Sequence, residues 1–294
     1  MGTVELPLVV GVDGSESSLG AVDWAVDEAA RHGTPLRLVY AFLWERYEGE
    51  TPSYSLDRPS EQVLAENIVD TAEERVRRRN PDVKVSTEVL PEEAVTALLH
   101  EGYSAFALVI GSRGRGDLAG LLLGSVSLAV AARAHCPVIV VRGDKAALSG
   151  THKRILLGVG DLTAGSGAVG FAFREAEARG CTLDAVHAWR RPAHESADQP
   201  LRASNAAKLH EMRAATLLDE ALGRAAGDHP AVRVSRATVE GPARKVLLER
   251  SGDADLLIVG AERRQGHLGL QLGRLAHTAL HHAACPVAVV PQRV

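Results

Sequence analysis

At 294 residues and 31.2 kDa, the chain is long enough for two domains of ordinary size. Hydrophobic residues make up 46% of it and charged residues 24%, a composition that excludes a disordered or fibrous protein. The net charge of −4 argues against nucleic acid as the main partner, because binding to a phosphate backbone requires a basic face.

The N-terminal sequence MGTVELPLVV has neither the basic region nor the long apolar region of a secretion signal. No apolar run approaches the ~18 residues that a transmembrane helix needs. Cys136, Cys181 and Cys285 lie far apart, without a CxxC pair or the spacing of a zinc site. We therefore expect a cytoplasmic protein with reduced thiols, no membrane attachment and no metal site.

Strand-like and helix-like segments alternate along the first half. Aromatic residues are only 4% of the chain, so Val, Leu, Ile and Ala must build the core, which favours a buried parallel sheet. Strands are predicted at 7–12, 35–42, 83–89, 106–110 and 137–141, and helices at 15–33, 61–79, 91–102 and 124–134. The third of these helices is expected to have Pro91 at its start. This alternation predicts a doubly wound α/β fold.

The run RVRRR at 75–79 raises the alternative of a nucleic-acid site. It stands at the end of a predicted helix, where cations interact favourably with the helix dipole. A solvated helix end is the interpretation we favour.

The sequence repeats itself. AHCPVIVVRG at 134–143 returns as AACPVAVVPQ at 283–292, and LVVGVDGSESS at 8–18 corresponds to ILLGVGDLTAG at 155–165. A repeat of this kind indicates one fold present twice. We predict two domains, 1–146 and 152–294, joined in the polar segment 143–154.

The stretch GSRGRGDLAGLLLGSVS at 111–127 follows a buried strand and leads into a helix. In a parallel sheet, ligands bind beyond the carboxyl ends of the strands, where Asp13 and Gly111 are both expected. Glycines let backbone amides approach a phosphate, and the N–H groups of a helix N-terminus attract anions. The hydroxyls of Ser125 and Ser127 can donate as well. A plain glycine-rich turn with Ser125 as a helix cap is the alternative.

The spacing Gly111-x2-Gly114-x9-Gly124-Ser125, with VGVDGS before it and HCPVIVV after it, resembles the nucleotide motif of the universal stress protein family in its ATP-binding branch. The resemblance covers nearly the whole chain, twice, as in tandem-domain members. It implies a five-stranded parallel sheet of order 3-2-1-4-5 in each domain, with helices on both faces, the adenine nucleotide alpha hydrolase-like fold.

The resemblance also implies where ATP, with or without Mg²⁺, is bound. Asp13 would lie beside adenine and ribose, the backbone of Ala41 would face the adenine, and the glycines with Ser125 would hold ribose and phosphates. The expected site comprises Val12, Asp13, Ala41, Ile110, Gly111, Gly114, Gly124, Ser125, Val126 and Ser127.

The second half departs from this motif. Gly260 and Gly273 keep the outer glycines, but Arg263 replaces Gly114 and Arg274 replaces Ser125. Gly160 aligns with Asp13, and Asp161 follows one place later. Two alternatives remain: an arginine binds phosphate in a different arrangement, or it fills an empty pocket.

The chain lacks a P-loop, a kinase signature and a GxSxG elbow, so we expect no dedicated catalysis. The first hypothesis is a nucleotide-dependent regulatory protein of the stress response. A slow ATPase or adenylate-transferring enzyme using the same pocket, with Asp13 as the only nearby acid, is the second, and an ATP-free interaction module is the third. The resemblance further implies self-association, with 137–141 and 286–290 pairing in an intrachain pseudo-dimer, because apolar strand edges tend to be covered.

Overall fold

The computed structural model describes residues 5–42, 60–114, 123–160, 167–190, 200–262 and 272–292. Its chain divides into two compact units, Met1–Arg142 and Gly143–Val294, which we call the N-terminal and the C-terminal unit. Among the described helices, none is long and apolar enough to cross a membrane.

The N-terminal unit is built on a parallel sheet in the order β3-β2-β1-β4-β5. β1 lies at its centre, where Val10 pairs with Leu38 of β2 on one side and Val109 of β4 on the other. All three side chains are buried, because helices cover both faces of the sheet. The strands are β1 (Leu8–Gly11), β2 (Leu36–Ala41), β3 (Val85–Leu90), β4 (Ala107–Gly111) and β5 (Val138–Val141).

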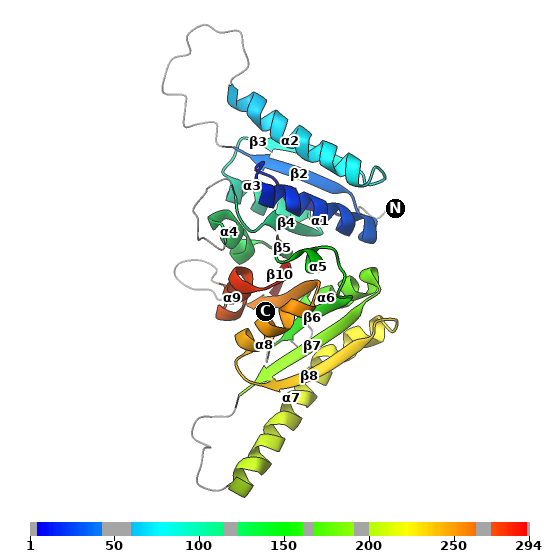
Figure 1. The fold of residues 1–294 in the computed structure, drawn as a ribbon, viewed down its shortest axis with the longest axis vertical. Helices are drawn as coiled ribbons and strands as arrows, with labels where there is room; N and C mark the ends of the chain where they lie inside the picture. The colour runs from blue at the N-terminus through cyan, green and yellow to red at the C-terminus, as the bar shows by residue number, and fades with distance from the viewer. Residues whose placement is uncertain are drawn as a thin grey trace. The chain divides into compact units, whose positions relative to one another are not determined.

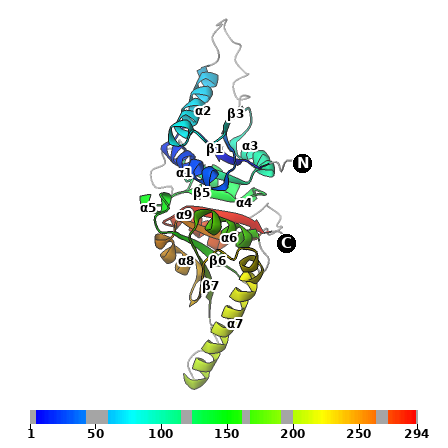
Figure 2. The same cartoon turned by 90° about the vertical axis from the view of Figure 1, so that its right-hand side faces the viewer.

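Two pairs of helices cover this sheet. α1 (Glu16–His32) packs beside α2 (Ser60–Arg79), and α3 (Ala94–Glu101) packs beside α4 (Ser125–Arg133) (Figures 1 and 2). α1 has the ends that its sequence predicts, with Ser15 as N-cap and Gly33 as a left-handed C-cap at φ 64°.

The expectation for Pro91 is wrong. α3 begins at Ala94, and Glu93 is its N-cap, whose carboxylate accepts a hydrogen bond from the Thr96 N–H at 3.0 Å. A side-chain acceptor satisfies the first turn here, so the helix starts after the acidic residues instead of at the proline. A short 3-10 helix, Gly102–Ser104, then leads into β4.

The arginines at the end of α2 are held by carboxylates. Arg75 donates to both oxygens of Asp23 on α1, at 2.7 and 2.5 Å, and Arg79 donates to both oxygens of Asp27, at 2.8 and 2.7 Å. The hydrogen bond from Asp23 raises the pKa of Arg75 above its ordinary value. Arg77, Arg78 and Arg79 are exposed, as a solvated helix end requires, and two arginines of the run also tie α2 to α1.

The C-terminal unit repeats the same arrangement, in the order β8-β7-β6-β9-β10, again with parallel strands. Its strands are β6 (Arg154–Val159), β7 (Thr182–Trp189), β8 (Val234–Glu240), β9 (Leu256–Glu262) and β10 (Val287–Gln292). Its helices are α6 (Gly167–Arg179), α7 (Pro200–Asp228), α8 (Ala243–Arg250) and α9 (Arg274–His282), with a 3-10 turn at Ser251–Asp253. The parallel α/β fold predicted from the sequence is confirmed for both halves.

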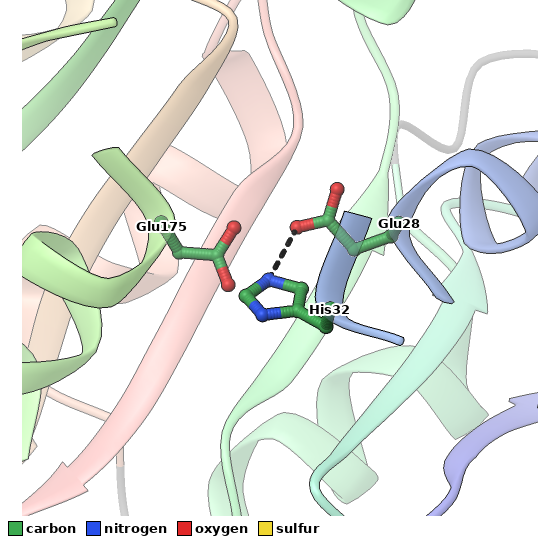
Figure 3. A group of neighbouring side chains, drawn as sticks. All are labelled: Glu28, His32 and Glu175. Atoms are coloured by element: carbon green, nitrogen blue, oxygen red, sulfur yellow. Dashed lines mark ion pairs between the residues drawn. The ribbon is translucent and has the colours of Figure 1, made fainter. Parts of the chain in front are cut away.

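The repeat extends to side chains on α1 and on its counterpart in the C-terminal unit, α6. In α1, Glu28 lies 2.7 Å from Arg31 and 3.4 Å from Nε2 of His32, as Figure 3 shows for the histidine. At the equivalent place in α6, Glu175 lies 3.3 Å from Nε of Arg179. Both helices thus keep a glutamate paired with a cation one turn later, a local contact between i and i+3 or i+4 neighbours.

The segment after Arg142 contains a helix that the sequence did not predict, α5 (Lys145–Leu148), with Asp144 as its N-cap. Gly143 has φ 101°, and a methyl group there would lie 2.2 Å from the Ala284 carbonyl oxygen. Asp144 N–H donates to that same oxygen at 3.1 Å, and the buried Asp255 accepts from His152 N–H at 2.9 Å. The segment is therefore built into the C-terminal unit.

Candidate functional site

A cavity of about 440 Å³ opens at the carboxyl ends of β1, β2 and β4 in the N-terminal unit. The ten residues singled out by the sequence all line it, so the fold brings the whole expected set together. Eight further residues complete the lining: Gly11, Ser18, Val39, Tyr40, Ala94, Leu98, Arg113 and Leu123.

Asp13 is oriented by serines at the start of α1. One of its carboxylate oxygens accepts hydrogen bonds from Ser15 N–H at 3.0 Å and from Ser15 Oγ–H at 2.6 Å. The backbone N–H of Asp13 donates to Ser18 Oγ at 3.3 Å, and Ser18 Oγ–H donates to the Ser15 carbonyl at 2.9 Å. The cap of α1 therefore also fixes an acidic group at the edge of the cavity.

Glycine at 111 is required by the protein's own backbone, whereas a methyl group at 114 would meet only the end of the Asp13 side chain. A methyl group on Gly111 would lie 2.7 Å from the backbone carbonyl of Ser17, and one on Gly114 would lie 2.7 Å from Oδ2 of Asp13. Real Cβ atoms essentially never approach another heavy atom so closely. These two glycines let α1 and Asp13 come close to the chain leaving β4.

Gly124 differs from these two. A methyl group there would have its nearest neighbours at 3.7 and 3.8 Å, an ordinary contact, and its backbone at φ −74° is open to any residue. No contact with the described residues explains a glycine at this position. It is therefore the place in the motif where a substitution reports most directly on a ligand.

The N-terminus of α4 faces the cavity with its first-turn amides. The first intrahelical bond is donated by Leu128 N–H to the Gly124 carbonyl, so the N–H groups of Ser125, Val126 and Ser127 have no acceptor within the helix. Gly124 N–H instead donates to the Ser112 carbonyl at 2.8 Å, which closes the base of the loop. Such a helix end, with its partial positive charge, attracts anions.

The Ser127 hydroxyl already has a hydrogen-bond partner within the protein. Ser127 is buried, and its Oγ–H donates to the Gly111 carbonyl at 2.8 Å. The hydrogen that was expected to reach a ligand thus holds β4 and α4 together. Ser125 is exposed at the cavity and keeps the position predicted for it.

Arg113 is the notable residue that the sequence reasoning missed. It lines the cavity between two glycines of the motif, and its guanidinium is a cation suited to phosphate. Its position between Gly111 and Gly114 could have identified it as a site residue from the sequence alone. Residues 115–122, the middle of the loop, lie outside the described residues.

The C-terminal unit differs at the corresponding places. The side-chain amide of Gln292 lies over Gly260, where a Cβ would be 1.8 Å from its nitrogen, and Arg274 is the first residue of α9. His187 stands where Tyr40 lies in the first half, and its Nδ1 is 2.9 Å from the Val159 carbonyl. Arg263 and Asp161, on which the sequence prediction for this half also depends, lie outside the described residues.

Two of the cysteines, Cys136 and Cys181, have raised pKa values. Cys136, which follows His135 in the sequence, is buried, and burial raises its pKa to about 11. Burial also raises the pKa of Cys181. The ring of His135 stacks on Tyr103, with centroids 4.5 Å apart. A nucleophilic cysteine requires a lowered pKa, and burial shifts the pKa of Cys136 in the opposite direction.

Comparisons with known proteins agree with the repeat. The profile of the universal stress protein family matches residues 7–142 and again residues 151–291. A universal stress protein of Mycobacterium tuberculosis is 35% identical over 293 residues, which cover 97% of either chain. Another, from Mycolicibacterium smegmatis, is 32% identical over 303 residues and 98% of each chain.

A solved structure shows the same fold. The crystal structure of a universal stress protein from Archaeoglobus fulgidus matches with a TM-score of 0.68 at 15% identity, covering 98% of this chain and 99% of that one. With the family profile matched twice and relatives aligned from end to end, the chain belongs to the universal stress protein family, as a member with two domains in tandem.

Proposed function

We propose that the N-terminal unit binds ATP, with or without Mg²⁺, and that the chain is a nucleotide-dependent regulatory protein of the cytoplasmic stress response without dedicated catalysis. The observation that carries this proposal is the cavity at the carboxyl ends of β1, β2 and β4. It is lined by the three glycines and the serine that define the motif, Gly111, Gly114, Gly124 and Ser125.

The lining suits a nucleotide in size and character. Val39, Leu98 and Ile110 supply apolar surface for a flat base, and the backbone of Ala41 stands beside them. The N-terminus of α4 supplies amides for phosphate, and Arg113 adds a cation. A cavity of about 440 Å³ with few, localised polar groups is typical of small-molecule sites.

The hydrogen bonds at Asp13 support binding over catalysis. Its Oδ1 already accepts two hydrogens from Ser15, which fixes the carboxylate as an orienting group. A slow ATPase would instead use Asp13 to position water. That alternative would be favoured if the protein turned over Mg-ATP repeatedly and Asp13→Asn abolished the turnover.

Titration calorimetry of the full chain tests the proposal with two glycine variants. Gly124→Ala adds a methyl group that the protein accommodates but that occupies the expected phosphate position, so ATP affinity should fall at least ~10-fold. Gly20→Ala, on α1 with nothing within 4 Å of the added methyl, is the matched control and should bind like the wild type. No ATP binding by the wild type, or equal affinity in both variants, would overturn the proposal.

Self-association belongs to the same proposal. The segments 137–141 and 286–290 are apolar. They contain β5 and most of β10, the strands that stand last in the strand order of their units. An apolar strand at the edge of a five-stranded sheet is a surface that proteins generally cover.

A further inference from the structure

The first turn of α1 reaches the phosphate side of the cavity through Ser17, a residue that does not itself line the cavity. Ser17 Oγ accepts a hydrogen bond from the backbone N–H of Arg113 at 3.1 Å. Arg113 stands between Gly111 and Gly114, where the chain has just left β4. The bond therefore fixes the entry of the motif loop to a helix 96 residues earlier in the chain.

Main-chain packing holds Ser17 in place for this contact. A methyl group on Gly111 would lie 2.7 Å from both the carbonyl carbon and the carbonyl oxygen of Ser17. Backbone atoms cannot rotate away as a side chain can, so Gly111 and Ser17 are in fixed register. The Ser17 hydroxyl is thereby presented to the next part of the loop.

The same turn of α1 also holds the other polar group of the site. Ser15 donates twice to Asp13, and Ser18 Oγ accepts from the Asp13 N–H. The start of α1 thus fixes Asp13 through two serines and the motif loop through a third. Asp13 and Arg113 both line the cavity, so one turn of helix sets their relative positions.

We propose that Ser17 is a positioning residue for phosphate binding, acting through the backbone of Arg113. This inference rests on the proposed ATP site. Without the Ser17 hydroxyl, the loop entry gains conformational freedom that a bound phosphate group must remove again. The base is expected against Val39, Leu98 and Ile110 and not against Arg113, so the loss should be larger for ATP than for adenosine.

Calorimetry with ATP and with adenosine, on the full chain, tests the proposal. Ser17→Ala should weaken ATP binding about fivefold, the scale of one hydrogen bond, and leave adenosine affinity within about twofold. Ser17→Thr keeps the hydroxyl and should restore ATP affinity. Ser86→Ala, an exposed serine on β3, is the matched control. In the ligand-free protein, the Arg113 amide should exchange faster in Ser17→Ala than in the wild type.

The outcomes separate this inference from the function on which it rests. If the wild type binds neither ATP nor adenosine, both fail. If the wild type binds ATP and Ser17→Ala binds it equally well, only the role of Ser17 is overturned. An equal loss for ATP and adenosine also overturns it, because that result indicates general disruption of the unit.

Discussion

Ser125 and Ser127 lie two positions apart in the first turn of α4 but differ in their surroundings. Ser127 is buried and its hydroxyl donates to the Gly111 carbonyl, whereas Ser125 is exposed at the cavity. A sequence pattern shows two hydroxyls near a helix N-terminus, and both were expected to donate to a ligand. Only the path of the chain between β4 and α4 shows which hydroxyl is already used.

Alanine substitutions should separate the roles of these two serines. Ser127→Ala leaves the buried Gly111 carbonyl without its donor and should lower the opening free energy of the N-terminal unit by ~1–3 kcal/mol, as measured by hydrogen exchange. Ser125→Ala should leave that free energy unchanged and weaken ATP binding about fivefold. Equal effects of the two substitutions on stability would contradict the assignment.

The strands and long helices were predictable because their patterns are local. β1 and β4 are continuous apolar runs, and α1 has a cap at either end of its amphipathic repeat. The contacts between elements were not predictable in the same way. The register of Ser17 against Gly111 joins residues far apart in sequence, and the start of α3 depends on the Glu93 cap rather than on Pro91. The helix α5 depends on a tertiary contact with Ala284.

The close contact between α1 and β4 makes the stability of the N-terminal unit sensitive to substitution at Gly111. Gly111→Ala places a methyl group against the Ser17 backbone and should destabilise the N-terminal unit by ~1–3 kcal/mol or more. Gly260→Ala, at the same motif position in the C-terminal unit, meets the movable end of Gln292 and should cost less. Hydrogen exchange of the α1 and α6 amides measures both. A larger loss for Gly260→Ala would contradict the packing argument.

At the scale of the whole molecule, the chain carries one fold twice but the complete motif only once. The sequence showed both facts, since the repeat covers the sheet of each unit while Arg263 and Arg274 interrupt the second motif. The structure adds that the Gln292 amide lies over Gly260, within β9. We therefore expect the two units to have diverged in ligand binding while keeping the same core.

The stoichiometry of ATP binding to the full chain tests this account most directly. Equilibrium dialysis against labelled ATP should saturate at one nucleotide per chain, and in the Gly124→Ala variant that single site should need at least ~10-fold more ATP to fill. Saturation at two nucleotides per chain would contradict the division of roles between the units. No bound nucleotide at all would contradict the central claim that the cavity of the N-terminal unit is an ATP site.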